Sequence, residues 1–559
     1  MRRFSALILC ILMLTGTVTI FSGCSDPSVE PVDPDRTQLY VNNYNGGYGT
    51  QWLYDLKARF EEDFKDVPYE KDKVGVQIII NAPKTSADGM FATFLGSSDE
   101  VFFNEKVFYN DYVDAGYLLP LTDIMTESLE KYGDTGTIEG KLIKSQKDYL
   151  KVDGEYYAIP HYEGYTGLVY DVDLFESEGF YFAKTHTAEY GDFVSDGYDE
   201  SLRSAGPDGD EGTYDDGLPA TYEEFYKLCD KLVADGIVPV GWSGKNPHYS
   251  NLLATSLHAS YEGPEQMMLN YDFTGTAKNL ITVNNGTVTR QGDVNLSTVA
   301  DGYKVYSQAG RYYALTFMEK LVSNQNYYSA GSFNSVKGHL DAQEDFLYGR
   351  FVPEKSRIAM HVDGIWWENE ADSVFEDMAK TFGNRASKNS RKFALLPSPK
   401  AGQTGEYAGQ TLYNNTEAYG FIRSTITSWK IPLAKAFLQY ANTNQSLKNF
   451  IVSTNTPKAL DVKFSSFTDE EKAQMTYFGK SVMQMRDECE VVYPLSQNEV
   501  FLNNQSQFTL HINMWQTQNA QQYPVTAMRA ASSNKITAEA YFKDIQNRYT
   551  ETYWNSLFL

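Results

Sequence analysis

The sequence predicts an α/β fold in which helices cover a mostly parallel sheet. Short apolar runs predict three buried strands, at residues 39–42, 74–80 and 100–103. The segments between these strands have the apolar spacing of helices, at residues 50–64 and 82–95. Such alternation of strands and helices is typical of a parallel sheet. About 520 of the 559 residues follow the N-terminal region, more than one small core requires, so we expect two or more lobes.

The N-terminal region is predicted to export and anchor the chain. A basic start and an uncharged, mostly apolar run over residues 4–21 lead to two small residues, the layout of a secretory signal over residues 1–23. Cys24 follows directly and resembles the lipidated cysteine of the bacterial lipoprotein lipobox. The alternative is an uncleaved membrane helix, because the run is about long enough to span a bilayer. Residues 24–37 contain three prolines and several acids, which predict an extended tether.

Composition limits the possible ligands. The net charge is −25, with 48 Lys and Arg against 73 Asp and Glu, and this balance argues against nucleic acid or anionic lipid as a partner. Aromatic residues make up 14% of the chain, and their faces suit the flat C–H faces of sugars. Beyond the signal and Cys24, only Cys229 and Cys489 remain. Two cysteines do not make a disulfide framework, so we expect two buried thiols, although their pairing stays open.

Five passages, taken in order, resemble one protein family. They are Asn-Gly-Gly-Tyr-Gly at 45–49, Val-Asp-Gly-Glu-Tyr-Tyr-Ala-Ile-Pro at 152–160, the run 357–366 with its Gly and Trp, the run 392–399 that ends in Leu-Leu-Pro-Ser-Pro, and Tyr-Gly-Phe-Ile at 419–422 followed by the run 434–440. Their order is similar to that of bacterial extracellular solute-binding proteins of sugar-binding family 1, the maltose-binding-protein class.

This resemblance implies a two-lobe, class II periplasmic-binding-protein fold with a hinge, and a ligand held in the cleft between the lobes. It also implies an ABC transporter permease as partner. Carried over by position, the lobes divide the chain into four parts: 38–168 and 424–485 for lobe 1, and 169–423 and 486–559 for lobe 2. An insertion rich in Asp and Gly at 180–220 departs from the family pattern, and its role stays open.

Candidate ligand-binding residues combine aromatic planes with hydrogen-bonding groups, the pattern that a sugar requires. The resemblance places a stacking aromatic at Trp366, which could instead be a core residue; its neighbour Trp367 is expected to pack inward if Trp366 does not. The other candidates lie at predicted strand ends, at the first crossing between lobes or late in the chain, and ordinary loop or core roles are the alternative for each: Asn45, Tyr48, Glu105, Tyr162, Glu163, Trp242, Tyr249, Asp363 and Trp515.

The insertion contains a candidate calcium loop, Gly-Pro-Asp-Gly-Asp-Glu-Gly-Thr-Tyr-Asp-Asp-Gly at 206–217. Calcium prefers several hard oxygen ligands on a loop that can curl around it. The loop lacks the EF-hand pattern, but it resembles the calcium loop of type II secretion pseudopilins. The expected role is structural, and a solvated acidic turn is the alternative. The candidate ligands are Asp208, Asp210, Thr213, Asp215 and Asp216.

No common catalytic signature is present: the chain has no Gly-x-Ser-x-Gly elbow, phosphate-binding loop or His-Glu-x-x-His pair. We therefore predict a non-enzymatic, extracytoplasmic component of an ABC importer, anchored to the membrane by lipidated Cys24, that captures a mono- or oligosaccharide. The alternatives are an exported carbohydrate-active enzyme using paired acids such as Glu105 and Asp363, or a surface glycan adhesin.

Overall fold

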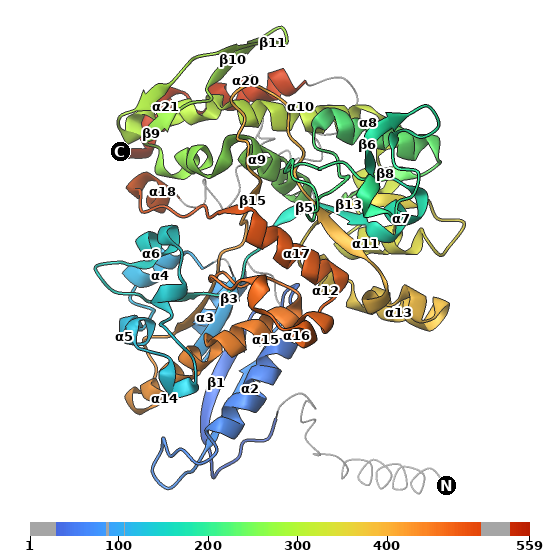
Figure 1. The fold of residues 1–559 in the computed structure, drawn as a ribbon. Helices are drawn as coiled ribbons and strands as arrows, with labels where there is room; N and C mark the ends of the chain where they lie inside the picture. Colours follow the sequence, from blue (N-terminus) through green and yellow to red (C-terminus); the bar gives the residue numbers. More distant parts are fainter. Residues whose placement is uncertain (1–29, 85–88, 106, 247, 505–536, 559) are drawn as a thin grey trace, which may run out of the picture.

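The chain folds into two α/β lobes. The computed structural model describes residues 30–84, 89–105, 107–246, 248–504 and 537–558. Figure 1 shows lobe 1 at the bottom in blue, cyan and orange, lobe 2 at the top, and helix α17 (Tyr477–Glu488) between them. Across these residues, no helix combines the length and the apolar character that crossing a bilayer demands. The predicted α/β architecture is confirmed.

Lobe 1 is built on a five-stranded sheet in the order β2-β1-β3-β16-β4. Strand β1 is parallel to β2 and β3, whereas β16 is antiparallel to β3 and β4. The strands are β1 Thr37–Asn43, β2 Val76–Asn81, β3 Val101–Glu105, β4 Ile159–Pro160 and β16 Ala418–Ile422. The helices are α2 Gln51–Asp63, α3 Met90–Gly96, α4 Tyr109–Asp114, α5 Thr122–Thr126, α6 Lys144–Leu150, α14 Ile431–Ala441, α15 Asn444–Thr454 and α16 Asp469–Ala473.

Lobe 2 is built on a mixed four-stranded sheet in the order β14-β5-β13-β8. Strand β13 is buried along its whole length, including His361 and Asp363, which bond to each other. The strands are β5 Thr166–Asp171, β8 Val238–Gly241, β13 Ile358–Gly364 and β14 Phe393–Leu396. The helices are α7 Val172–Glu178, α8 Tyr222–Ala234, α9 His248–Asp272, α10 Ala309–Ser323, α11 His339–Tyr348, α12 Trp367–Glu370, α13 Asp372–Phe382, α18 Glu499–Asn503, α20 Ala538–Arg548 and α21 Glu551–Asn555.

Four short strand pairs lie outside the two main sheets. Three are antiparallel and one, β15 with β17, is parallel. They are β6 Phe182–Thr187 with β7 Gly191–Phe193, β9 Gly275–Ala277 with β12 Val294–Leu296, β10 Ile281–Asn284 with β11 Thr287–Arg290, and β15 Thr411–Tyr413 with β17 Glu490–Val492. The pair β6–β7 lies within the insertion at 180–220.

The chain passes between the lobes at places that differ from the limits carried over by resemblance. The first passage, at 161–165, lies between β4 and β5, just before the expected limit after 168. Strand β16 falls inside the expected lobe 2 range 169–423 but pairs in the sheet of lobe 1, so the second passage precedes it. The expected limit after 485 falls within α17. This helix contributes Met483 to the core of lobe 1, and Phe478 and Val482 to a core of lobe 2.

The end of the predicted tether is bound to lobe 1. The backbone N–H of Asp33 donates to Gln77 Oε1 at 2.8 Å, and Gln77 Nε2 donates to the Pro31 carbonyl at 2.9 Å. Lys57 of α2 forms an ion pair with Glu30. Residues 30–36 of the expected tether 24–37 therefore lie against the first lobe, because Gln77 on β2 offers both a donor and an acceptor to an otherwise unpaired segment.

A buried charge network lies at the first passage between lobes. The side chain of Glu163 has no exposed surface, and Arg486 of α17 donates to it through Nε at 3.3 Å and Nη2 at 3.2 Å. The hydroxyls of Tyr165 and Tyr493 also donate to this carboxylate. Burying a carboxylate is tolerated only when such partners satisfy it. The network therefore joins the passage at 161–165 to α17 and to the segment after β17.

We expect Arg486→Met to lower the free energy of unfolding by about 3–5 kcal/mol, because it leaves the buried Glu163 carboxylate without its cation. Urea unfolding followed by circular dichroism measures this loss. Arg385→Met, at an exposed arginine, is the control and should change stability by less than about 0.5 kcal/mol. Adding Glu163→Gln to Arg486→Met should recover part of the loss. Equal stability of Arg486→Met and wild type would contradict the role of the network.

Candidate ligand site between the lobes

Trp366 lies where the two lobes meet. It follows β13, is partly buried, and packs against the cores of both lobes. Its ring centroid is 6.4 Å from that of Tyr48 in lobe 1, with the rings nearly perpendicular at 89°. On the lobe 2 side, its ring is 6.1 Å from that of Tyr249 of α9, and its Nε1 donates to the Tyr249 hydroxyl at 3.4 Å. One indole thus contacts tyrosines from both lobes.

Two glycines make room for this indole. A Cβ atom placed on Gly47 would lie 2.8 Å from Trp366 Cβ, and one on Gly364 would lie 2.2 Å from the Trp366 ring. Real Cβ atoms do not approach other heavy atoms that closely, so any larger residue would displace the ring or the backbone. Gly47 belongs to the turn between β1 and α2. The glycine-rich turn of lobe 1 therefore forms one wall for the indole.

The lobe 1 side of the junction carries two tyrosines and a carboxylate. The rings of Tyr48 and Tyr162 are 4.4 Å apart, edge to face. The Tyr162 hydroxyl donates to Glu105 Oε1 at 2.6 Å, at the carboxyl end of β3, and the Tyr48 hydroxyl donates to the Glu163 carbonyl at 3.1 Å. Burial, reinforced by the Glu105 charge, holds the pKa of both phenols well above its usual range. Both hydroxyls therefore stay protonated and able to donate.

The lobe 2 side carries two carboxylates held by one glutamine. Gln343 Nε2 of α11 donates to Asp363 Oδ2 at 2.9 Å and to Glu370 Oε2 at 3.2 Å. Asp363 is fully buried and also accepts the backbone N–H of Gly364 at 2.7 Å. His361 Nε2 lies 3.2 Å from the same carboxylate. Asp363 is therefore a fixed acceptor whose bonds orient the turn before Trp366.

Glu370 belongs to the site but is not among the residues that were predicted from the sequence. Burial and the neighbouring Asp363 charge, with a smaller effect of Glu105, raise the pKa of Glu370 to about 8. Glu105 of lobe 1 therefore acts electrostatically on a carboxyl group of lobe 2. Spacing could have revealed this residue, because Glu370 is four positions after Trp366 and α12 brings such positions to one face.

The structure therefore brings together six of the candidate residues, which we call the junction cluster: Tyr48, Glu105, Tyr162, Tyr249, Asp363 and Trp366. Their neighbour Trp367 has no exposed surface and belongs to a core of lobe 2. The cluster combines rings with acceptor carboxylates and phenol donors. These are the chemical groups that a molecule with an apolar face and hydroxyl edges requires of its site.

Other candidates lie elsewhere. Glu163 is occupied by the Arg486 network described above. Trp242 is 2% exposed and packs against Tyr328 and Phe333, at ring distances of 5.3 and 5.5 Å, within lobe 2. The side chain of Asn45 donates to the Ala82 carbonyl at 3.5 Å, within lobe 1. Trp515 and Cys24 lie outside the described residues.

The candidate calcium loop forms a compact turn held by its own carboxylates. Asp215 accepts the backbone N–H of Asp208 at 3.0 Å and the Thr213 hydroxyl at 2.9 Å, and Asp216 accepts the backbone N–H of Gly212 at 2.8 Å. Burial raises the pKa of Asp215 to about 7. Over the part of the chain that the structure covers, no three His, Cys, Asp or Glu side chains are grouped as metal ligands. Calcium binding here stays a prediction, which calorimetric titration with calcium chloride tests.

The two remaining cysteines are free thiols. Cys229 is buried in lobe 2, and Cys489 is partly buried at the end of α17. The sulfur of Cys489 lies 3.4 Å from the Tyr214 hydroxyl of the insertion.

Comparisons with known proteins agree with this architecture. A family model of bacterial extracellular solute-binding proteins matches residues 49–448. A solved chitin oligosaccharide binding protein is 15% identical with a TM-score of 0.51, over 92% of this chain and 98% of that one. A solute-binding protein, RafE, solved in complex with raffinose, is 14% identical with a TM-score of 0.51, over 94% of this chain and 100% of that one. At such identities the likeness concerns the fold. No curated protein sequence matches the chain.

The raised pKa of Glu370 predicts how stability depends on pH. In the unfolded chain this carboxyl ionises near pH 4.5 and in the folded chain near pH 8, so its contribution to stability falls as pH rises between these values. We expect Glu370→Gln to raise the midpoint of urea unfolding relative to wild type at pH 8.5, and to lose this advantage at pH 5. Glu376→Gln, at an exposed position of α13, is the control. An advantage independent of pH would contradict the assignment.

Proposed function

Because the chain belongs to the bacterial extracellular solute-binding protein family, we propose that it captures a carbohydrate between its lobes for an ABC importer. One observation carries the proposal: Trp366 lies between the cores of the two lobes, beside one phenol from each. The structural relatives named above bind a chitin oligosaccharide and raffinose, which supports a sugar as the ligand class.

The chemistry of the junction cluster supports this ligand class. The flat C–H face of a pyranose packs well on an indole, and Trp366 supplies one. Hydroxyls at the sugar edge need acceptors and donors at the same time. Glu105 supplies a carboxylate acceptor, and Glu370, whose pKa is raised to about 8, supplies a carboxyl that can donate as well as accept. The Tyr249 hydroxyl accepts from Trp366 and stays protonated, so it can donate. Charged acceptors form the stronger hydrogen bonds to hydroxyls.

Opening and closing of the lobes would couple capture to delivery. The present contacts of Trp366 with Tyr48 and Tyr249 join the lobes. A ligand that touches both lobes favours the closed arrangement by the difference between its affinities for the closed and open states. Hinge closure of this type uses a few residues between rigid lobes, and the passage at 161–165 is such a segment. An importer that recognises the closed form would then receive only loaded protein.

The acid pair of Glu105 and Asp363 is poorly suited to glycoside hydrolysis. A hydrolase needs two carboxyl groups that reach the scissile bond from opposite sides. Asp363 has no exposed surface, and its oxygens accept hydrogen bonds from Gln343 and Gly364. The pair of Glu105 and Asp363 therefore lacks a second acid that is accessible to a substrate.

Family membership places the chain outside the cytoplasm. The proposed attachment to the membrane is lipidation of Cys24 after removal of residues 1–23. Incorporation of labelled palmitate into the exported protein tests this attachment.

We expect Trp366→Ala to weaken sugar binding at least roughly tenfold, because it removes the stacking plane at the centre of the site. Intrinsic tryptophan fluorescence, measured across mono- and oligosaccharides that include raffinose and chitin oligosaccharides, identifies the ligand and its affinity. Trp429→Ala, at a tryptophan that is 41% exposed in lobe 1, is the matched control and should bind as wild type does.

The proposal fails if the folded wild-type protein binds no sugar of this panel. It also fails if product analysis after incubation with the bound glycan reveals turnover, because a receptor leaves its ligand unchanged.

A further inference from the structure

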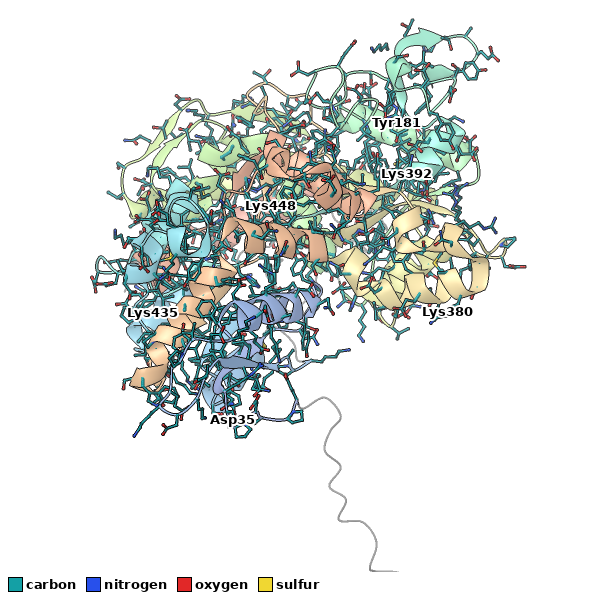
Figure 2. The ribbon with its side chains drawn as sticks, turned by 60° about the horizontal axis from the view of Figure 1, so that its bottom comes forward. Asp35, Tyr181, Lys380, Lys392, Lys435 and Lys448 are labelled. Carbon is teal, nitrogen blue, oxygen red and sulfur yellow. The ribbon has the colours of Figure 1, made fainter. Side chains whose placement is uncertain are left out.

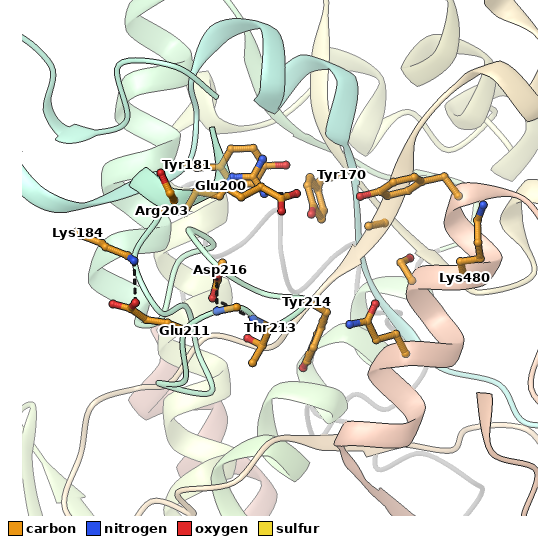
Figure 3. Close-up of a pocket in the computed structure, with 16 residues that line it drawn as sticks. Tyr170, Tyr181, Lys184, Glu200, Arg203, Glu211, Thr213, Tyr214, Asp216 and Lys480 are labelled. Carbon is orange, nitrogen blue, oxygen red and sulfur yellow. Dashed lines mark hydrogen bonds and ion pairs between the residues drawn. The ribbon is translucent and has the colours of Figure 1, made fainter. Parts of the chain in front are cut away.

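A cavity on lobe 2 lies away from Trp366. Its volume is about 690 Å³, and it lies between the insertion at 180–220 and α17. Tyr170 of β5 and Ala394 of β14 contribute lining from the sheet. Figure 3 shows Tyr181, Arg203 and Tyr214 from the insertion side and Lys480 on α17, arranged around an open centre. None of the residues that line it belongs to the junction cluster.

The cavity has the dimensions of a small-molecule site. Pockets that bind small ligands have volumes of about 300–1,000 Å³, and this cavity lies within that range. The cavity also lies far from the N-terminal end of lobe 1. Figure 2 shows Tyr181, which lines the cavity, at the opposite end of the view from Asp35 in lobe 1. The insertion that departs from the family pattern forms one of its walls.

Aromatic rings line the cavity on several sides, from Tyr170, Tyr181, Tyr214 and Tyr477. Tyr477, at the start of α17, is 40% exposed, so part of its ring is open to a ligand. Tyr170 and Tyr181 are almost fully buried. An exposed tyrosine ring in a cavity lined by polar side chains is a suitable plane for the C–H face of a sugar.

Charges of opposite sign balance around the cavity. Lys184 pairs with Glu211 at 2.7 Å, and Arg203 lies 3.8 Å from Glu200. The Asp216 carboxylate accepts a hydrogen bond from the backbone N–H of Gly212. Lys480 is the third cationic side chain of the lining. The cavity is therefore lined by three cationic and three acidic side chains. A neutral ligand fits such a lining better than an ion, since neither sign of charge is in excess.

Hydrogen-bonding capacity remains available for that ligand. Arg203 is only 8% exposed, its guanidinium lies 3.7 Å from the Tyr181 ring centroid, and among the described residues nothing accepts a hydrogen bond from its Nε. Because this Nε has almost no accessible surface, it belongs to the wall of the cavity and is not a donor that a ligand reaches. On α17, Lys480 forms no ion pair within the described part of the chain. It lies on the same helix face as Gln484.

We propose that this cavity is a second carbohydrate site, which takes a neutral sugar unit. Each sugar hydroxyl donates and accepts, so it matches a lining that offers both carboxylates and cationic donors. The insertion would thus add a binding surface to lobe 2. The turn at 206–217 holds part of the wall, because Thr213 and Asp216 line the cavity. The proposal rests on this lining and does not depend on the site at Trp366.

Calorimetric titration with raffinose, maltotriose and tri-N-acetylchitotriose tests the second site. The wild type is compared with Trp366→Ala, which disables the junction, and with Trp366→Ala/Tyr477→Ala/Lys480→Ala, which also alters the cavity. Trp366→Ala should retain binding of at least one of these sugars. The additional substitutions should weaken that residual binding roughly tenfold, through the loss of one stacking plane and one donor. Circular dichroism verifies that each variant is folded.

The matched control combines Trp366→Ala with Tyr198→Ala and Lys380→Ala, at a tyrosine that is 64% exposed and a lysine side chain that is 70% exposed. It should retain the affinity of Trp366→Ala. If Trp366→Ala binds none of the three sugars, or if the cavity variant and the control bind equally, the second site is refuted. Wild-type binding that disappears in Trp366→Ala would leave the proposed function standing. Wild-type binding that Trp366→Ala leaves unchanged would instead count against the junction.

Discussion

The relation between the lobes depends on a carboxylate that has lost all contact with solvent. Glu163 lies where the chain first leaves lobe 1, and its charge is compensated by Arg486 and by two phenols. A buried charge of this kind tolerates little displacement of its partner, because separation would leave both ions in a medium of low dielectric constant. Since Arg486 belongs to α17, the pair fixes this helix against the passage at 161–165.

The position of α17 then determines two surfaces. On one side, the helix packs into the cores of both lobes and sets where they meet, near Trp366. On the other side, Lys480 and Gln484 face the cavity beneath the insertion. A motion of the lobes that rotates α17 would therefore reach both surfaces. The insertion is also linked to the end of this helix by the contact between Tyr214 and Cys489.

Local patterns in the sequence predicted the elements that depend on local physics. The expected helix at 50–64 corresponds to α2, and the expected strand at 39–42 lies within β1, because apolar periodicity reports directly on burial. The expected helix at 82–95 is shorter: residues 82–84 are not helical and α3 begins at Met90. Pro83 disfavours helical geometry in the residue before it, and a prediction from apolar periodicity alone does not include this effect.

Non-local contacts explain what the sequence did not reveal. Tyr48, Tyr162 and Trp366 come from distant parts of the chain, and only strand ends and family resemblance suggested that they meet. Glu163 and Trp242 satisfied the same criteria but are buried in other surroundings. A predicted strand end locates the backbone of a residue but does not give the direction of its side chain. The direction of the Glu163 side chain depends on Arg486, and no pattern in the sequence links these two residues.

The attachment of residues 30–36 to lobe 1 limits the distance between this lobe and a membrane in which Cys24 is anchored. Glu30 is already paired with Lys57, so only five residues would separate a lipidated Cys24 from the folded body, a reach of at most about 20 Å. The lipid anchor would then hold the first lobe close to the bilayer. The second lobe, with its insertion, would lie farther from the lipid anchor than the first.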